Sequence, residues 1–370
     1  MDKFLQIHLL TSYPPSNLNR DDLGRPKTAL MGGTTRLRIS SQSLKRAWRT
    51  SEFFEDALSG HIGTRTKEMG VEIYKKFSKQ GVSHKKALDW AGKIAGVFGK
   101  RKSLSAKENK ELKELSPEKR LKKELTEVAI EQLAHFGPEE EKAIWALVDA
   151  IIARGEGPEK EELNLLRAKS GAADIALFGR MLASSPSHNM EAAAQVAHAI
   201  TVNKVAVEDD FFTAVDDLNN GEEDMGAAHM GETEFGSGVF YIYICIDRHL
   251  LLENLNGDQD LADRSITALL ECAAKVAPTG KQNSFASRAH ASFMACETGN
   301  QQPRSLSVAF LEPVSEKGKE KNMLAAAIER LDLTRTNMDK VYGACSDNFC
   351  AMNAHSGEGS LQAVIQCATE

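Results

Sequence analysis

The alternation of apolar and polar residues predicts strands near both ends of the chain, with helices between them. Residues 4–10, FLQIHLL, place apolar side chains on both sides of an extended chain, which indicates a central strand. The next stretch, TSYPPSNLNRDDLGRPK, is rich in proline and turn formers and predicts a long loop. TRLRISSQSLKRAWRTSEFF then changes from a short alternating run to a helical period, with Ser40 or Ser41 as the helix cap.

The middle of the chain differs from its two ends in amino-acid composition. Residues 61–170 consist mostly of lysine, glutamate, alanine and leucine, which predicts several short helices. From residue 171 the pattern is typical of strands again, beginning with ADIALFGRM. AHAITVNKVAVEDDFFTAVDDL then predicts a protruding hairpin or extended arm, and FGSGVFYIYICID is the clearest strand in the sequence.

The C-terminal third continues this mixture of elements. A helix is expected from Asp260 to about Val276, because apolar residues recur there at helical spacing. Beyond residue 300, SLSVAFLEP predicts a strand and KNMLAAAIERL a helix. This order of elements predicts an α+β fold, in which a sheet domain is interrupted by inserts.

Composition places the protein among intracellular globular chains. Its 370 residues are enough for about two domains, and 42% hydrophobic residues can fill a core. No apolar run approaches the ~18 residues of a membrane span, and the N-terminus lacks a signal peptide's apolar middle. The six cysteines are spread over the last third, which indicates reduced thiols rather than a disulfide framework. We therefore expect a cytoplasmic protein with no membrane partner.

Charge is distributed unevenly along the chain. The net charge of −6 divides into +3 for residues 1–60, +5 for 61–170 and −14 for 171–370. A polyanionic partner is possible despite the net charge, because a partner feels the field of one face. Residues 100–123 hold ten basic and four acidic residues. That stretch is either the solvated face of helices or a contact for a nucleic-acid backbone.

A cluster of cations around residues 36–49 is the strongest candidate for binding chemistry. On the predicted helix, Gln42, Lys45, Arg46 and Arg49 share one side, and the apolar stripe of Leu44, Ala47 and Trp48 lies opposite. The helix start adds partial positive charge and free N–H groups beside serine hydroxyls, which suits phosphate. The alternative is a capped amphipathic helix with an exposed basic face. The absence of acidic residues among Arg36, Arg38 and the helix cations favours phosphate binding.

Other chemistry has weaker support in the sequence. Asp21 and Asp22, next to Arg20, could hold a divalent metal for phosphodiester cleavage, or could simply stabilise a turn. Cys345 and Cys350 lack the spacing of a zinc site. No dinucleotide, P-loop or nucleophile-elbow motif occurs in a suitable context.

Two methionines next to glycine-containing motifs could act as wedges against a nucleobase. They are Met181 in GRM and Met230 in AHMG, although a lone methionine can equally fill a core. Phe211 and Phe212 raise the same question, because on a strand one should point inward and the other could meet a partner.

A series of short motifs in fixed order resembles one known family. The motifs are LNRDD, RISSQSLKRAWR, DIALFGRM, AHAIT, FFTAVDDL, AHMG and EFGSGVFY. Through them the chain resembles the CasC-type backbone subunit of type I-E CRISPR Cascade complexes over about residues 4–290, and PTGKQNSFA adds Lys281 and Gln282. The prediction for later residues depends on the hydrophobic pattern alone.

The resemblance implies a hand-like architecture. It consists of a palm with an RNA-recognition-motif (RRM-like, ferredoxin-like) fold, an inserted helical finger domain and an extended β-hairpin thumb. The implied ranges are 1–60 for the first part of the palm, 61–170 for the fingers, 171–192 for a palm strand, 193–236 for the thumb and 237–370 for the rest of the palm.

The same resemblance implies a non-catalytic role in antiviral defence. The subunit would bind CRISPR RNA, stack on copies of itself as a helical filament of about six, and prepare the guide for pairing with a target DNA strand. Its other partners would be the remaining Cascade subunits and, indirectly, a recruited helicase-nuclease. No cofactor or metal is expected.

Residue roles carry over where the motifs match. Met181 and Met230 resemble the apolar pair beside a displaced base, with Arg180 and His229 next to them. Phe212 and Thr213 match thumb positions that meet the guide–target duplex. The full set expected to bind RNA is Arg20, Arg38, Ser40, Gln42, Lys45, Arg46, Arg49, Arg180, Met181, Phe212, Thr213, His229, Met230 and Lys281.

Two other functions stay open at this stage. A metal-dependent ribonuclease subunit of a type III-like effector would use Asp21 or Asp22 as its metal ligand. A free-standing single-strand-binding protein would share the cations without a defined guide RNA.

Overall fold

The structure is a computed structural model that describes the chain except for residues 168, 170, 215–228 and 316–321, and the side chains of 106, 109, 113, 214 and 229. The described residues form two compact units. Unit 1 comprises residues 1–57, 194–249 and 263–370, and unit 2 comprises 58–193 and 250–262. Each unit is described by itself below.

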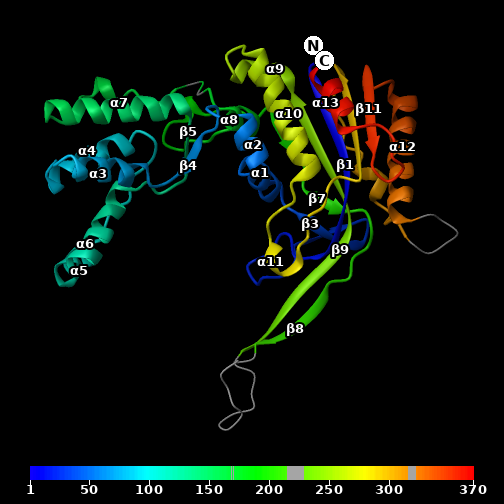
Figure 1. The fold of residues 1–370 in the computed structure, drawn as a ribbon, viewed down its shortest axis with the longest axis horizontal. Coiled ribbons are helices and arrows are strands. Elements are labelled where there is room, and N and C mark those ends of the chain that lie inside the picture. The colour runs from blue at the N-terminus through cyan, green and yellow to red at the C-terminus, as the bar shows by residue number, and fades with distance from the viewer. Residues whose placement is uncertain (168, 170, 215–228, 316–321) are drawn as a thin grey trace, which may run out of the picture. The chain divides into compact units, whose positions relative to one another are not determined.

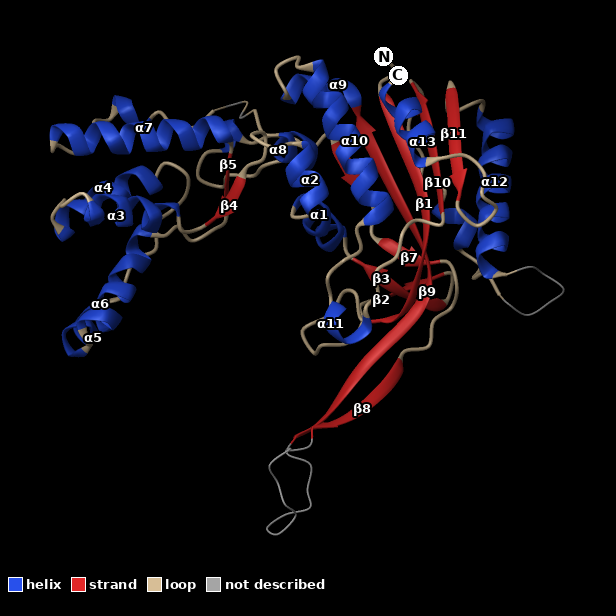
Figure 2. Ribbon diagram, in the orientation of Figure 1, coloured by secondary structure: helices blue, strands red, loops and turns tan. Residues whose placement is uncertain are grey.

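Unit 1 is built on a large antiparallel sheet, which confirms the predicted α+β class (Figure 2). The described part of the chain gives this sheet nine strands, in the order β11-β10-β1-β9-β7-β3-β2, with β6 and β8 also paired to β9. The strands are β1 (Phe4–Ser16), β2 (Thr28–Met31), β3 (Thr34–Ile39), β6 (Ala194–Val196), β7 (Ala199–Thr201), β8 (Glu208–Ala214), β9 (His229–Asp247), β10 (Phe293–Gly299) and β11 (Asn348–Asn353).

Strand β1 is the centre of this sheet, as FLQIHLL predicted. Ile7 lies opposite Ile244 on β9 and Cys296 on β10, and Leu5, Ile7 and Leu9 are fully buried. The strand runs further than predicted, to Ser16, because its pairing with β9 continues past an irregularity after Tyr13. The strand pairing with β9 therefore outweighs the preference of the two prolines for a turn.

Helices and a short 3₁₀ helix cover the faces of the sheet. On one face, Leu10, Tyr241 and Phe293 pack with residues of helix α12 (Met323–Tyr342) and the 3₁₀ helix η5 (Ser307–Phe310). On the other face, α13 packs against β10 and β11. The helices that lie wholly in unit 1 are α1 (Ser41–Arg49), α2 (Glu52–Ala57), α11 (Gln282–Phe285), α12 (Met323–Tyr342) and α13 (Leu361–Thr369). Helices α9 (Arg248–Asn254) and α10 (Gln259–Lys275) each have residues in both units, because 250–262 belong to unit 2.

A buried polar network crosses the centre of the sheet. His8 Nδ1 lies 2.8 Å from the Tyr241 hydroxyl, and His8 Nε2 lies 3.1 Å from Glu297 Oε2. Arg304 donates to both oxygens of Glu297, at 3.0 and 3.2 Å. Burial lowers the pKa of His8, so we assign a neutral imidazole that donates to Glu297 and accepts from Tyr241, and assign the ion pair to Arg304.

Strands β8 and β9 form the hairpin that the sequence predicted as a protruding arm (Figure 1). Glu208 to Ala214 pair with Phe235 to His229, and β9 then continues into the central sheet. The residues between the two strands, within the range 193–236 expected to form a thumb, lie outside the described residues.

Unit 2 contains the helical block predicted for residues 61–170. Its core includes Phe77, Trp90, Phe136 and Ile144, with a two-stranded sheet of β4 (Thr64–Thr66) and β5 (Ala134–Phe136) at one side. Its helices are α3 (Met69–Lys79), α4 (His84–Ala95), α5 (Ala106–Glu111), α6 (Pro117–Glu124), α7 (Pro138–Arg154) and α8 (Ala173–Phe178), and its 3₁₀ helices are η1 (Leu112–Glu114), η2 (Leu125–Val128), η3 (Glu161–Leu163) and η4 (Pro186–His188).

Two predicted strands are helical. ADIALFGRM forms α8, in which residues 173–177 are all buried. A short run that is buried on every side shows no helical period of apolar and polar residues, so the sequence could not distinguish a helix from a strand. SLSVAFLEP contains the 3₁₀ helix η5 (Ser307–Phe310), where Phe310 is buried and Val308 is 44% exposed. None of the helices in the described part of the chain is both long and apolar enough to cross a membrane.

Candidate nucleic-acid interface

Helix α1 has the amphipathic character that the sequence predicted. Leu44, Ala47 and Trp48 are buried, whereas Gln42 and Arg46 are exposed. Ser40 is the N-cap, and its side chain accepts a hydrogen bond from the Ser43 backbone N–H at 3.3 Å. Lys45 and Arg49 are half-buried on the outer side of the helix.

The loop after β1 folds back onto the start of α1. The Asn19 side chain accepts a hydrogen bond from the Ser40 backbone N–H at 2.8 Å. Asn17 is fully buried, and its amide donates to the carbonyl oxygens of Gly24 and Glu234, at 3.0 and 2.9 Å. These bonds fix the loop between α1 and β9, which positions Arg20 beside the helix.

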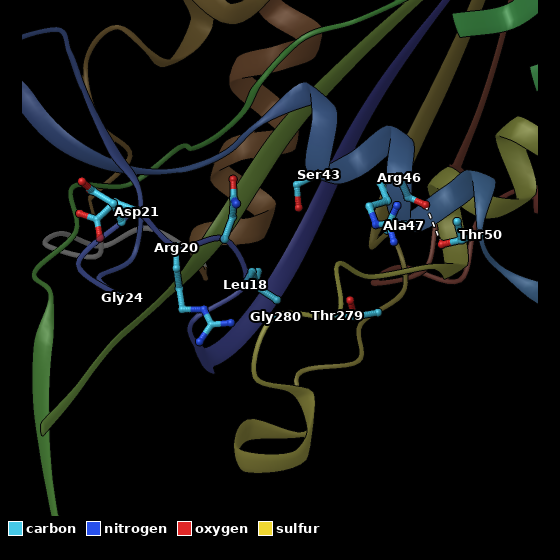
Figure 3. Close-up of a pocket in the computed structure, with 12 residues that line it drawn as sticks. Leu18, Arg20, Asp21, Gly24, Ser43, Arg46, Ala47, Thr50, Thr279 and Gly280 are labelled. Carbon is cyan, nitrogen blue, oxygen red and sulfur yellow. Dashed lines mark hydrogen bonds between the residues drawn. The ribbon is translucent and has the colours of Figure 1, made fainter. Parts of the chain in front are cut away.

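A pocket of about 570 Å³ lies between this loop, α1 and the segment before α11 (Figure 3). Arg20 comes from the loop, Ser43 and Arg46 from the helix, and Thr279 and Gly280 from the third wall. The third wall fits closely, because a Cβ at Gly280 would lie 2.2 Å from the Leu18 carbonyl oxygen. The full lining is Leu18, Asn19, Arg20, Asp21, Asp22, Gly24, Ser43, Arg46, Ala47, Thr50, Thr279 and Gly280.

The pocket lining holds two arginines, Arg20 and Arg46, beside two aspartates, Asp21 and Asp22. Arg20 and Arg46 are both exposed, and neither guanidinium forms an ion pair with a carboxylate among the described residues. Burial lowers the pKa of the nearby Lys45 ammonium, so a bound anion would favour its charged form. Positive side chains next to a helix N-terminus suit a phosphate group.

Asp21 has a structural task in the same loop. Its Oδ1 accepts hydrogen bonds from the backbone N–H groups of Leu23 and Arg25, both at 2.9 Å. This is the turn-stabilising alternative that the sequence left open for the aspartate pair. Among the described residues, no group of three histidine, cysteine or acidic side chains is arranged to hold a metal ion.

Two arginines on β3 differ in their surroundings. Arg38 is half-buried on β3, and its Nη1 lies 3.0 Å from His198 Nδ1. Arg36 is fully buried, and it donates to Thr34 Oγ1 and to the carbonyl oxygens of Thr201, Phe310 and Leu311. Arg36 therefore belongs to the interior of unit 1. The sequence alone indicated that it was one of the cations of the basic surface.

Lys281 extends the interface toward the hairpin. Its Nζ donates to Thr233 Oγ1 on β9 at 2.7 Å, and the rings of Phe235 and Phe285 lie 5.9 Å apart. The backbone of Lys281 has a φ of 47°, a left-handed conformation that residues other than glycine rarely adopt. The contact with β9 holds this strained turn in place.

The hairpin side chains divide between its two faces. Phe212 lies opposite Gly231, and Thr213 lies opposite Met230, so Phe212 and Met230 are on different faces. Met230 shares its face with Phe211, which is 61% exposed. Phe212 is 42% exposed, so neither phenylalanine points into a core, contrary to the expectation for one of them. His229 lies in β9, and its side chain is outside the described residues.

Met181 and Arg180 belong to unit 2, where they have opposite environments. Met181 is 77% exposed beside a pocket of about 270 Å³. Arg180 is buried, and its Nη1 donates to both carboxylate oxygens of Glu140, at 2.9 and 2.7 Å. Its Nη2 donates to the carbonyl oxygens of Arg167 and His188. This placement corrects the expected role of Arg180, because its donors are already occupied inside the protein.

The basic stretch 100–123 is partly neutralised within unit 2. Lys123 pairs with Glu111 at 3.1 Å, and Arg120 pairs with Glu124 at 2.9 Å. Lys119 and Lys122 are exposed on α6 and form no ion pair with a described residue. The surface of α6 thus retains part of the positive charge that the sequence indicated.

Sequence reasoning did not include Thr50, Thr279 and Gly280 in the site. Thr50 ends α1, where its hydroxyl donates to the Arg46 carbonyl oxygen at 2.8 Å. Thr279 and Gly280 belong to the PTGK turn, whose glycine signals a close backbone approach. That signal marks a turn, but it does not say which distant segment the turn contacts.

The fold and the pocket together define an α+β protein with a polar pocket that presents two exposed arginines. The chain belongs to the CT1975-like protein family, whose model matches residues 5–368. A chain in the solved structure titled "CRISPR RNA-guided surveillance complex, pre-nicking" is 28% identical, with a TM-score of 0.79, over 99% of this chain and 100% of that chain.

A second solved structure, titled "CRISPR RNA-guided surveillance complex", contains a chain 24% identical with a TM-score of 0.59, over 99% of this chain and 98% of that chain. At this identity it supports the fold alone. No curated protein matches the chain. The family match and the first structural match confirm the resemblance that the sequence motifs carried.

Proposed function

We propose that the protein is the CRISPR RNA-binding backbone subunit of a type I-E Cascade effector. In this proposal it is a cytoplasmic, non-catalytic protein, and several copies stack as a filament along the guide, beside the other Cascade subunits. The filament prepares the guide for pairing with a target DNA strand. The observation that carries the proposal is the pocket that Arg20 and Arg46 line together with the Ser43 and Thr50 hydroxyls.

The topology of unit 1 supports an RRM-like palm. The strands β10, β1 and β9 are adjacent in that order, and the short strands β6 and β7 pair with the other side of β9. Helix α1 follows β1 in the chain, and α10 connects β9 to β10. This is the β-α-β-β-α-β order of a ferredoxin-like fold, into which unit 2 would be inserted as fingers and β8–β9 as a thumb.

The chemistry of the pocket supports sequence-independent binding. Arginine, helix N–H groups and hydroxyls contact phosphate and ribose, which carry no base information. Such contacts suit a subunit that must accept any spacer, because base pairing then supplies the specificity. Asp21, whose carboxylate stabilises the loop, fits a non-catalytic role better than that of a metal ligand.

The test is to purify the full chain with its complex, extract the nucleic acid, and measure RNA affinity against salt concentration. Arg46→Ala and Arg20→Ala should each weaken binding to the same degree for unrelated spacer sequences. Each should also reduce the slope of log affinity against log salt by ~0.7, the value for one phosphate contact on a single strand.

Lys340→Ala is the matched control, because Lys340 is an exposed cation at the end of α12 and its loss changes the net charge equally. It should leave both affinity and slope unchanged. A complex that contains no RNA, or losses that depend on the spacer sequence, would contradict the proposal.

A further inference from the structure

The β8–β9 hairpin leaves the central sheet at an irregular point of β9. Tyr13 lies opposite Gly238 and Ser16 lies opposite Gly236, so two residues of β1 stand against one residue of β9. Such a bulge bends a strand and changes its direction. In the described part of the chain, β8 pairs with no strand other than β9. Contacts other than strand pairing must therefore hold the base of the hairpin.

Two alternate residues at this base contact the turn of residues 278–287. Lys281 Nζ donates to Thr233 Oγ1 at 2.7 Å, and the rings of Phe235 and Phe285 lie 5.9 Å apart. Thr233 and Phe235 point to the same face of β9, because side chains alternate along a strand. The same turn forms the third wall of the pocket of about 570 Å³ (Figure 3).

Glu234, which lies between these two residues, contacts the loop after β1. Its backbone carbonyl oxygen accepts a hydrogen bond from the Asn17 side-chain amide at 2.9 Å, and its Oε1 lies 3.0 Å from Arg25 Nε. This loop, residues 17–25, supplies Arg20 to the pocket. Three consecutive residues of β9 thus contact both of the loops that form pocket walls.

The turn and the loop also depend on each other. A Cβ at Gly280 would lie 2.2 Å from the Leu18 carbonyl oxygen, so the two segments leave no space between them. The turn contains two non-glycine residues with positive φ, Lys281 at 47° and Ala286 at 48°. Residues keep such strained conformations only where their surroundings impose them. Loss of the contacts with β9 should therefore relax the turn and, through Gly280, loosen the loop.

We propose that Thr233, Glu234 and Phe235 are positioning residues for the pocket, and that they tie its shape to the seating of the β8–β9 hairpin. None of the three is among the residues that line the pocket. They act through the turn and the loop, which hold Arg20 in place. The coupling is reciprocal, so an anion in the pocket stabilises the seated hairpin to the same degree. The inference rests on the proposed function, because it takes this pocket as the site that binds guide phosphates.

The first measurement is hydrogen exchange of the full chain without nucleic acid. Thr233→Val keeps the size of the side chain but removes the acceptor for Lys281. It should speed the exchange of the Leu23 and Arg25 amides, which donate to Asp21 Oδ1, by ~5-fold or more. The Thr233 side chain contacts the turn, so an effect on the loop reports the coupling between the two.

A second variant and a matched control complete this measurement. Phe235→Leu weakens the ring contact with the turn and should have the same effect on the loop. Thr35→Val is the control, because Thr35 is an exposed threonine on β3, and its replacement should change neither the loop nor the turn. Faster exchange confined to residues 278–287, with the loop unchanged, would overturn the proposal.

The second measurement is the affinity of the same chains for a fluorescent oligouridylate. Thr233→Val should weaken binding by ~5-fold or more, because a loosened pocket must be ordered when the ligand binds. This effect should disappear in an Arg20→Ala background, in which the loop no longer offers its cation. It should persist in Arg46→Ala, because Arg46 comes from α1.

The outcomes separate this inference from the proposed function. Equal losses in the unmodified, Arg20→Ala and Arg46→Ala backgrounds would show that Thr233 does not act through the loop, and would overturn the inference alone. An unmodified chain that does not bind the oligouridylate would contradict the proposed function. Hydrogen exchange would still decide whether β9 holds both walls of the pocket.

Discussion

Replacement of Arg180 by alanine distinguishes a structural role from an RNA contact. The side chains of Arg180 and Glu140 are both fully buried, and removal of the arginine would leave the Glu140 carboxylate without its charged partner. Breaking a buried ion pair in this way costs ~3–5 kcal/mol of unfolding free energy. Arg180→Ala also removes the donors to the carbonyl oxygens of Arg167 and His188.

The expected loss can be expressed as a melting temperature. Unit 2 spans residues 58–193 and 250–262, a size at which 1 kcal/mol shifts the midpoint by ~2–4 °C. The transition of unit 2 should therefore fall by roughly 10 °C in Arg180→Ala, as measured by calorimetry. Hydrogen exchange should locate the loss in α7 and the segment after α8.

A second substitution provides the control for this prediction. In an Arg180→Met, Glu140→Met pair, both charges are gone, so much of the stability should return despite the absence of the arginine. If Arg180 instead bound RNA directly, Arg180→Ala would leave the melting temperature within about 1 °C and lower the affinity for the guide. That outcome would refute the structural assignment.

Three further predictions concern the cap, the hairpin and the response to acid. Ser40→Ala should cost ~0.5–2 kcal/mol of unfolding free energy in urea titrations, because the α1 cap is lost, whereas Ser41→Ala, one position later, should cost less. Gly231→Ala would place a Cβ 2.6 Å from Phe212 Cζ, so it should displace that ring, seen by NMR, and be neutral in a Phe212→Ala background; equal effects in both backgrounds would contradict this contact. The unfolding free energy should fall as the pH drops below ~6.5, since the pKa of His8 is lowered by burial and protonation favours the unfolded chain. It should fall further between about pH 4.3 and 2. Burial alone would raise the pKa of Glu297, but hydrogen bonds from His8 and Arg304 and the charge of Arg304 lower it to about 2. A flat profile from pH 7 to 5 would show that His8 is not held neutral.

Much of the site could be predicted because it depends on local periodicity. The stripe of Leu44 and Trp48 identified the buried side of α1, which left Gln42 and Arg46 on its outer side. The Ser40 cap follows from residue type and position at a helix start. The hairpin was also foreseeable, since strand patterns flank a polar centre.

Other parts of the site depend on contacts between distant residues. Thr279 and Gly280 complete a pocket whose other walls lie more than 200 positions earlier in the chain. Arg36 and Arg38 are two residues apart on one strand, yet one reaches carbonyl groups of residues 310 and 311 inside the protein. Alternation along β3 predicts that the two share one face, so it gives no sign that Arg36 is fully buried while Arg38 is only half-buried.

The sequence by itself determined the α+β class, the central strand β1, the cation-bearing helix α1 and, through its ordered motifs, the family. These depend on repeating patterns that each segment carries within itself. Only the tertiary structure decided which cations are available to a ligand and that α8 is helical. The residue type alone gives the charge of a side chain, but its exposure and pKa depend on the groups that folding places around it.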